Sequence, residues 1–123
     1  MSRSAFLIFT AVVAIIYGLG LVLVPAMVNE MHGLASSPAT SVMSRYFGVA
    51  LLGIAVMAWL AREAADSDAL SAFLQGACVM NVIGLIVSLH AVFTGLMNAV
   101  GWLPVIIQLL LAIGFGYFGF LRR

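Results

Sequence analysis

The stretch SVMSRYFGVALLGIAVMAWLARE, residues 41–63, decides the fold class. It carries no charged side chain between Arg45 and Arg62. Its apolar part, 42–61, matches the roughly 20 residues that a helix needs to cross a hydrocarbon core of about 30 Å. A backbone in lipid must satisfy its own hydrogen bonds, so this stretch is predicted to be a membrane-spanning helix. Arg45, inside its first turns, then requires an explanation.

Similar apolar runs lie on both sides of this stretch. Of the 123 residues, 65% are hydrophobic and 7% are charged, which leaves too little charged surface for a water-soluble domain. The sequence therefore predicts an all-α integral membrane four-helix bundle that forms a single domain over residues 1–123, with the lipid bilayer as its solvent. The expected spans lie near residues 5–25, 42–61, 69–92 and 102–121.

The arginines predict the orientation, because cytoplasmic loops carry an excess of basic residues. With the N-terminus inside, all but one of the arginines lie on the cytoplasmic side: Arg3, Arg62, Arg122 and Arg123. Arg45 alone lies toward the outside. We therefore expect both termini in the cytoplasm and a multi-pass protein of the cell (inner) membrane.

Small and polar residues recur at helical spacing and mark the faces that pack, as is usual between membrane helices. In the third run the stripe comprises Ala77, Asn81, Gly84, Ser88 and Ala91. The other runs have similar stripes, and these include Tyr17 with Gly18, Arg45 with Gly48, and Gln108 with Gly116. Arg45, Tyr17, Gln108 and Asn81 are thus predicted to face protein. Glycine-lined faces of this kind also suit a homo-oligomer or a larger membrane complex.

The two outer connections are richer in apolar residues than ordinary loops. In the first, Met27, Met31 and Leu34 recur at helical spacing opposite polar Asn29, Glu30 and His32. This pattern predicts a short amphipathic segment lying in the membrane interface. Ser37 followed by Pro38 is expected to cap and begin the second helix, and Ser67 or Asp68 to cap the third. Pro104 is expected in the opening turn of the fourth helix.

Helix rise places the candidate site in the outer half of the bundle. From the outer helix ends, Arg45 is about 5 Å deep, Gln108 roughly 8 Å and Tyr17 about 12 Å, with Asn81 near the midplane. The first three of these side chains are expected to converge beneath the connection that holds Glu30 and His32.

Two interpretations of Arg45 stay open. Arg45 is either a structural tie to Glu30 or a residue that holds an anionic group, such as a lipid headgroup, a carboxylate or a quinone oxygen. Asn81 and Gln108 similarly suit hydrogen bonds between helices or contacts to a ligand.

Several function classes lack the residues that they need. The acidic side chains all lie in connections, so the membrane-embedded acid of a proton-coupled pump is missing, and no nucleophile lies beside a base. His90 lies on a bulky face without a facing histidine, so neither a haem nor a metal is expected. The net charge of +1 gives no surface for nucleic acid.

We expect a non-enzymatic binding or accessory subunit without a cofactor. The alternative is lipid, small-molecule or quinone binding or transport at Arg45.

The stretches YGLGLVLVP (17–25) and SRYFGVALLGIAVMAWLAR (44–62) resemble small bacterial four-helix membrane proteins of the DoxX-like and related uncharacterised groups. These proteins share a glycine-rich first helix that ends at a proline, then an arginine and a glycine that open the second helix. The matching positions are Tyr17, Gly18, Pro25, Arg45 and Gly48. The resemblance implies a compact four-helix bundle, in groups of which some members are linked to quinone-associated redox complexes.

Overall fold

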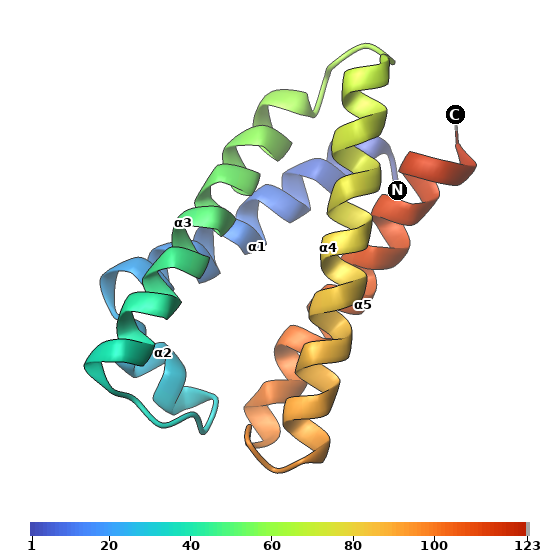
Figure 1. Ribbon diagram of the computed structural model, residues 1–123. Helices are drawn as coiled ribbons and strands as arrows, with labels where there is room; N and C mark the ends of the chain where they lie inside the picture. The colour runs from blue at the N-terminus through green and yellow to red at the C-terminus, as the bar shows by residue number, and fades with distance from the viewer. Residues whose placement is uncertain (123) are drawn as a thin grey trace. The chain divides into compact units, whose positions relative to one another are not determined.

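The computed structural model describes residues 1–122, and these residues form helices and no strands (Figure 1). The elements along the chain are α1 (Arg3–Leu23), α2 (Pro25–Met31), α3 (Pro38–Ala61), α4 (Asp68–Phe93), η1 (Ala99–Gly101), α5 (Trp102–Gly116) and η2 (Tyr117–Leu121). Four of the helical stretches are long and apolar enough to cross a membrane: Arg3–Leu23, Pro38–Ala61, Asp68–Phe93 and Ala99–Leu121. The all-α prediction and the existence of four candidate spans are therefore confirmed.

The helix starts follow from capping side chains. Ser37 and Thr40 form a reciprocal capping box, in which each side chain accepts from the other residue's backbone N–H, and Pro38 takes the first helical position. Ser67, not Asp68, caps α4 by accepting from the backbone N–H of Leu70. These caps start α3 at Pro38, four residues before the predicted span. Arg45 therefore lies seven residues inside the helix, about 10 Å from its start.

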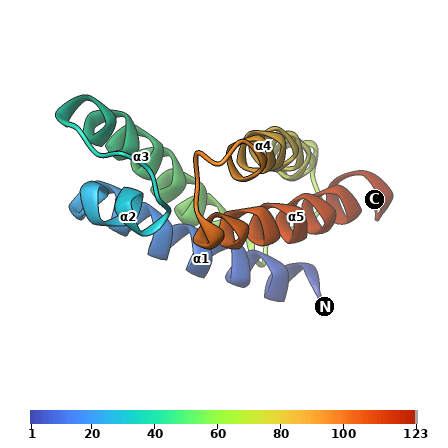
Figure 2. The same cartoon turned by 90° about the horizontal axis from the view of Figure 1, so that it is seen from below.

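The chain folds as two compact units, Met1–Glu63 and Ala64–Arg123, and each is described by itself for its part of residues 1–122. The prediction of a single domain concerns how these units associate, and it stays a prediction. In the first unit, α1 and α3 run antiparallel and pack along their lengths, and α2 folds back at the end where they are joined (Figures 1 and 2).

Small residues allow the backbones of α1 and α3 to approach each other closely. Gly48 is buried, and a Cβ atom at that position would lie 2.8 Å from the carbonyl oxygen of Gly18. Elsewhere along the two helices, the buried residues include Leu7 and Ala14 of α1 and Ala55 of α3. The predicted packing stripe of α3 is thus correct for its small members.

α2 is the predicted short segment of the first outer connection, and its polar residues are not where the amphipathic pattern placed them. Asn29 and His32 are buried at 7% exposure each, whereas Met27 and Met31 are more than half exposed. The helix ends in a Schellman motif. The N–H of Gly33 donates to Glu30 and that of Leu34 to Asn29, and Gly33 has the positive φ of 77° that this motif needs. Asn29 and His32 face inward because they form hydrogen bonds with side chains of α3 and α1, as described below.

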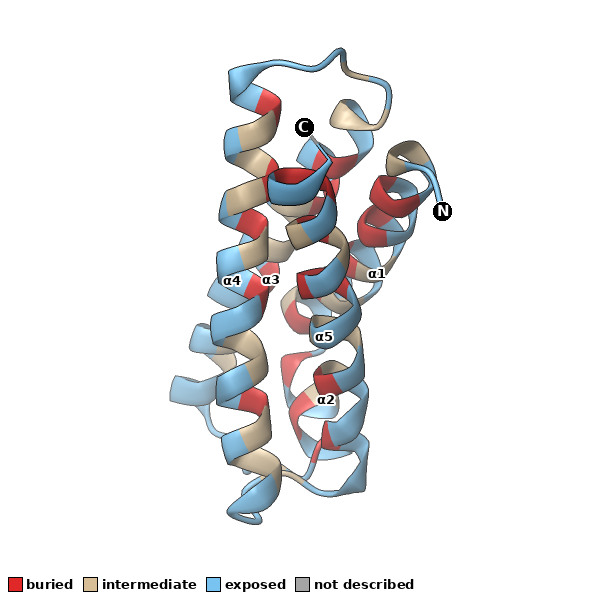
Figure 3. Cartoon of the chain, turned by 90° about the vertical axis from the view of Figure 1, so that its right-hand side faces the viewer, coloured by how far each residue is buried: buried red, intermediate tan, exposed pale blue. Residues whose placement is uncertain are grey.

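The second unit consists of α4 packed antiparallel on α5, η1 and η2. Buried positions on α4 lie along the side next to α5 (Figure 3), and they include the predicted stripe members Ala77, Asn81 and Ser88. The bulky residues expected to meet lipid, Ile83 and Ile86 among them, are exposed. The predicted packing face of α4 is therefore confirmed within this unit.

The end of the fourth span is a π-helical turn, Tyr117–Leu121, which the sequence did not indicate. A π turn lengthens the hydrogen-bonded ring and frees nearby backbone groups. The carbonyl oxygen of Gly119 accepts a hydrogen bond of 2.9 Å from Nε2 of Gln75 on α4. A Cβ atom at Gly119 would lie 3.1 Å from the backbone nitrogen of Gln75, so the π turn brings the two backbones close together.

Candidate functional site

The polar side chains of the first unit gather at its α2 end, beginning with Tyr17 of α1 and His32 at the end of α2. The Tyr17 hydroxyl lies 3.1 Å from Nε2 of His32, and their rings are inclined at 54° with centroids 5.8 Å apart. Nδ1 of His32 lies 2.8 Å from the carbonyl oxygen of Val28, which can only accept. Nδ1 therefore carries the hydrogen, and in the neutral ring Nε2 accepts from the Tyr17 hydroxyl.

A second pair joins α2 to α3. Nδ2 of Asn29 donates to the hydroxyl oxygen of Ser44 at 2.9 Å, and the Ser44 hydroxyl lies 3.2 Å from Oδ1 of Asn29. Asn29 and His32 are three residues apart, so they lie on one face of α2. Through this face α2 is attached to both long helices, to α3 by Asn29 and to α1 by His32.

Arg45 reaches across from α3 to the end of α1. Its Nε donates a hydrogen bond of 3.1 Å to the carbonyl oxygen of Val22, and the side chain is exposed. Val22 belongs to the last turn of α1, where carbonyl groups lack partners within the helix and the helix dipole favours a positive charge. α1 has no basic residue of its own in that turn, so α3 supplies one. Arg45 therefore faces its neighbouring helix, as predicted, but it remains exposed.

Glu30, the predicted partner of Arg45, lies on α2 and is exposed. In the part of the chain that the structure describes, the hydrogen bond of the Arg45 guanidinium goes to a backbone carbonyl and not to this carboxylate. The tie that Arg45 makes is thus to Val22 of α1.

Gln108 and Asn81, the other predicted site residues, belong to the second unit. Oε1 of Gln108 accepts a 2.7 Å hydrogen bond from the Ser88 hydroxyl, and its amide packs against Gly84 of α4. Gln108 is therefore a partner between helices. Asn81 is buried, but its Nδ2 donates to the Ala77 carbonyl of its own helix at 2.8 Å. The convergence of Gln108 with Arg45 and Tyr17 stays a prediction.

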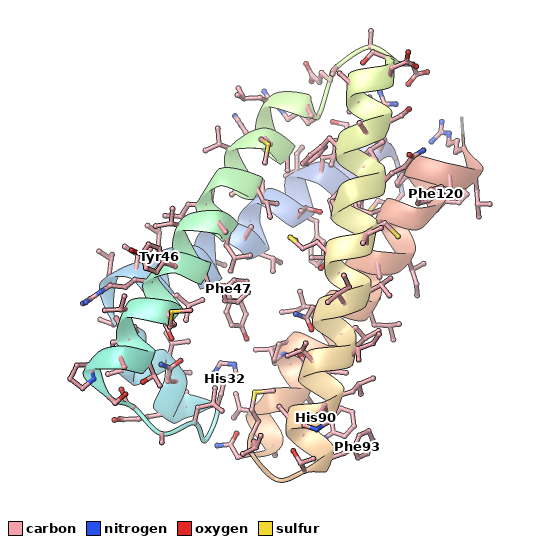
Figure 4. All side chains as sticks on the ribbon, viewed as in Figure 1. His32, Tyr46, Phe47, His90, Phe93 and Phe120 are labelled. Atoms are coloured by element: carbon pink, nitrogen blue, oxygen red, sulfur yellow. The ribbon has the colours of Figure 1, made fainter. Side chains whose placement is uncertain are left out.

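Sequence reasoning missed His32, which it treated as part of an interfacial loop. The signal was present: Pro25 can start a helix, Gly33 can end one, and Asn29 and His32 then share a face. Figure 4 shows His32 at the α2 end, and shows His90 with Phe93 at one end of α4. His90 is exposed, as expected from its place on the bulky face of that helix.

No protein-family model, no curated protein and no solved structure matches the chain. Buried polar groups that bond one another, such as those of Tyr17 and His32, orient helices. An exposed guanidinium with one nitrogen committed, that of Arg45, can in addition bind an anion.

Proposed function

We propose that this chain is a small multi-pass protein of the cell (inner) membrane that works as a binding or accessory subunit without catalysis of its own. The observation that supports this proposal is that polar side chains of the apolar helices form hydrogen bonds with one another. In the first unit the Tyr17 hydroxyl of α1 bonds to His32 at the end of α2, and in the second unit Ser88 of α4 bonds to Gln108 of α5. Such bonds hold membrane helices in register, which is what a scaffold for a partner needs.

The proposed topology has both termini in the cytoplasm, with the α2 end of the first unit outside. Support comes from the arginines, since this orientation leaves Arg45 as the one exception to the positive-inside rule. The proposal includes a four-helix bundle formed by the two units, in a homo-oligomer or a larger membrane complex. The resemblance of residues 17–25 and 44–62 to DoxX-like proteins is in keeping with that bundle.

A second candidate function is binding of a lipid, small molecule or quinone at Arg45. The specific observation in its favour is the position of the guanidinium, which is exposed on an apolar helix with only Nε bonded to protein among the described residues. An ionisable side chain placed within a membrane span is commonly functional. Tyr17, on α1 of the same unit, is its proposed neighbour.

The test of the accessory role is the size of the particle that contains the chain. The tagged chain is extracted from its own cells in a mild detergent and compared with the same chain purified after expression alone. The proposal predicts a larger particle from its own cells, with a defined second component or a fixed number of copies. Equal sizes with a single copy would contradict the accessory role, and so would turnover of a substrate by the chain alone.

A further inference from the structure

Arg45 lies within α3, and Arg62 is the residue that caps its C-terminal end. The two guanidinium groups differ in how many of their N–H groups donate to the protein. Arg62, at the end of the helix, donates from Nη1 to the Trp59 carbonyl at 2.6 Å, and its guanidinium carbon lies 4.0 Å from the centre of the Trp59 ring. Arg45 uses only Nε, at the Val22 carbonyl. Within residues 1–122 its two terminal nitrogens donate to no protein group. Because the bond from Nε to the Val22 carbonyl orients the planar guanidinium, it also restricts the positions of the two terminal nitrogens.

A residue with a hydroxyl group, Ser41, lies one helical turn before Arg45. Ser41 precedes Arg45 by four residues, so the two side chains share a face, with Cβ atoms about 5–6 Å apart. Side chains on a helix lean toward its N-terminus, which directs Arg45 over the turn that contains Ser41. Ser41 is partly exposed, and in the described residues its hydroxyl has no hydrogen-bond partner.

The surroundings of this pair are apolar and exposed. Val42, Tyr46 and Val49 lie nearest to it around α3 and are each at least about half exposed. The span begins at Pro38, so Arg45 lies about 10 Å below the helix start, from where its long side chain can reach the headgroup layer. A ligand at this place needs an anionic head for Arg45 and Ser41 and an apolar body for the surface beside them.

We propose that Arg45 and Ser41 form a binding site for the phosphate of an anionic phospholipid. The forked guanidinium matches phosphate oxygens in pairs, and the acyl chains lie on the exposed apolar surface of α3. The inference rests on the proposed membrane-spanning role of α3. It also accounts for an arginine on the predicted outer side, because the bound phosphate neutralises it. Among the described residues, the hydrogen bond of the Arg45 guanidinium goes to Val22, and Glu30 of α2 does not accept from it.

The test measures thermal unfolding of the full chain in a neutral detergent, with added phosphatidylglycerol, phosphatidylcholine or inorganic phosphate. Phosphatidylglycerol should raise Tm by about 5 °C or more at saturation, since a ligand of the folded state stabilises it. Phosphatidylcholine should have a much smaller effect. A shift as large with inorganic phosphate alone would show a free-anion site and overturn the lipid proposal. Equal shifts with both lipids would overturn it as well.

Variants locate the site. Arg45→Gln should raise the apparent Kd for phosphatidylglycerol by at least about tenfold. The matched control is Arg62→Gln, which makes the same charge change at the other end of the helix and should leave that Kd within about twofold. Ser41→Ala leaves the bond to Val22 intact and should weaken binding severalfold, which keeps the test open if Arg45→Gln fails to fold. Unchanged lipid affinity in Arg45→Gln, or in Ser41→Ala if only that variant folds, would overturn the proposal but leave the accessory role standing, since particle size tests that role separately.

Discussion

The Tyr17 hydroxyl on α1 lies 3.1 Å from Nε2 of His32, and the other ring nitrogen of His32 is 2.8 Å from the Val28 carbonyl within α2. Both nitrogens of a buried imidazole are therefore satisfied, one by its own helix and one by a neighbour. This arrangement fixes the ring and attaches α2 to the pair of long helices. It makes the α2 end of the first unit an ordered structure and not a flexible loop.

Tyr17→Phe removes the hydroxyl and leaves Nε2 of His32 buried without a donor. We expect the free energy of unfolding to fall by about 1 kcal/mol, in the range found for hydrogen bonds between membrane helices. The measurement is unfolding by denaturing detergent in mixed micelles. Tyr46→Phe is the control, because Tyr46 is 68% exposed and should be replaceable at no cost. Equal losses for the two variants would show that the bond to His32 contributes nothing.

Gly48→Ala places a methyl group 2.8 Å from the carbonyl oxygen of Gly18, and a backbone atom cannot move aside cheaply. The expected loss in the free energy of unfolding is about 1–3 kcal/mol, as for other overpacked sites. Gly53→Ala, on the same helix, meets no atom within 4 Å. It should be neutral or stabilising by less than about 1 kcal/mol. If Gly53→Ala were the more damaging of the two, the packing of α1 on α3 described above would be wrong.

In the second unit, Ser88→Ala removes the hydroxyl that donates to Oε1 of Gln108 and leaves this oxygen without a donor. Replacing both residues by apolar ones also removes the oxygen that lacks a partner. Removing one partner of a buried pair costs more than removing both. We expect Ser88→Ala to cost about 0.6–1.7 kcal/mol, and Gln108→Leu in that background to recover part of the loss. A double-mutant cycle from unfolding in mixed micelles gives the coupling energy. A coupling energy near zero would be incompatible with the 2.7 Å bond.

Much of the fold could be predicted because hydrophobic length and capping residues are local signals. The apolar runs give the long helices, and Ser37 with Pro38 and Ser67 mark where two of them begin. The π turn at Tyr117–Leu121 is not marked by a local signal of this kind, and its Gly119 carbonyl accepts a hydrogen bond from Gln75, which belongs to another helix.

The candidate site was predicted less well. The stripe at four- and three-residue spacing predicts that Arg45 faces protein, and its Nε does bond to the end of α1. Its partner there is the backbone carbonyl of Val22, and no side-chain pattern in the sequence reveals a free carbonyl. The amphipathic pattern predicts that Asn29 and His32 lie on the exposed face of α2, whereas both are buried. Periodicity gives the faces of a helix and not which face a neighbour covers. Partners such as Ser44 and Tyr17 decide that, and they come from other helices.

In the proposed topology the chain crosses the membrane four times with the Arg45 end outside, and cysteine labelling of each connection distinguishes this topology from the inverted one. Cys78→Ala provides the background, since Cys78 is the only cysteine. Single cysteines are then placed in each connection as Ser36→Cys, Ala65→Cys and Leu96→Cys, and spheroplasts are treated with a membrane-impermeant maleimide. The account predicts labelling at 36 and 96 in intact spheroplasts, and at 65 only after lysis. Labelling at 65 alone, or at all three positions before lysis, would contradict it.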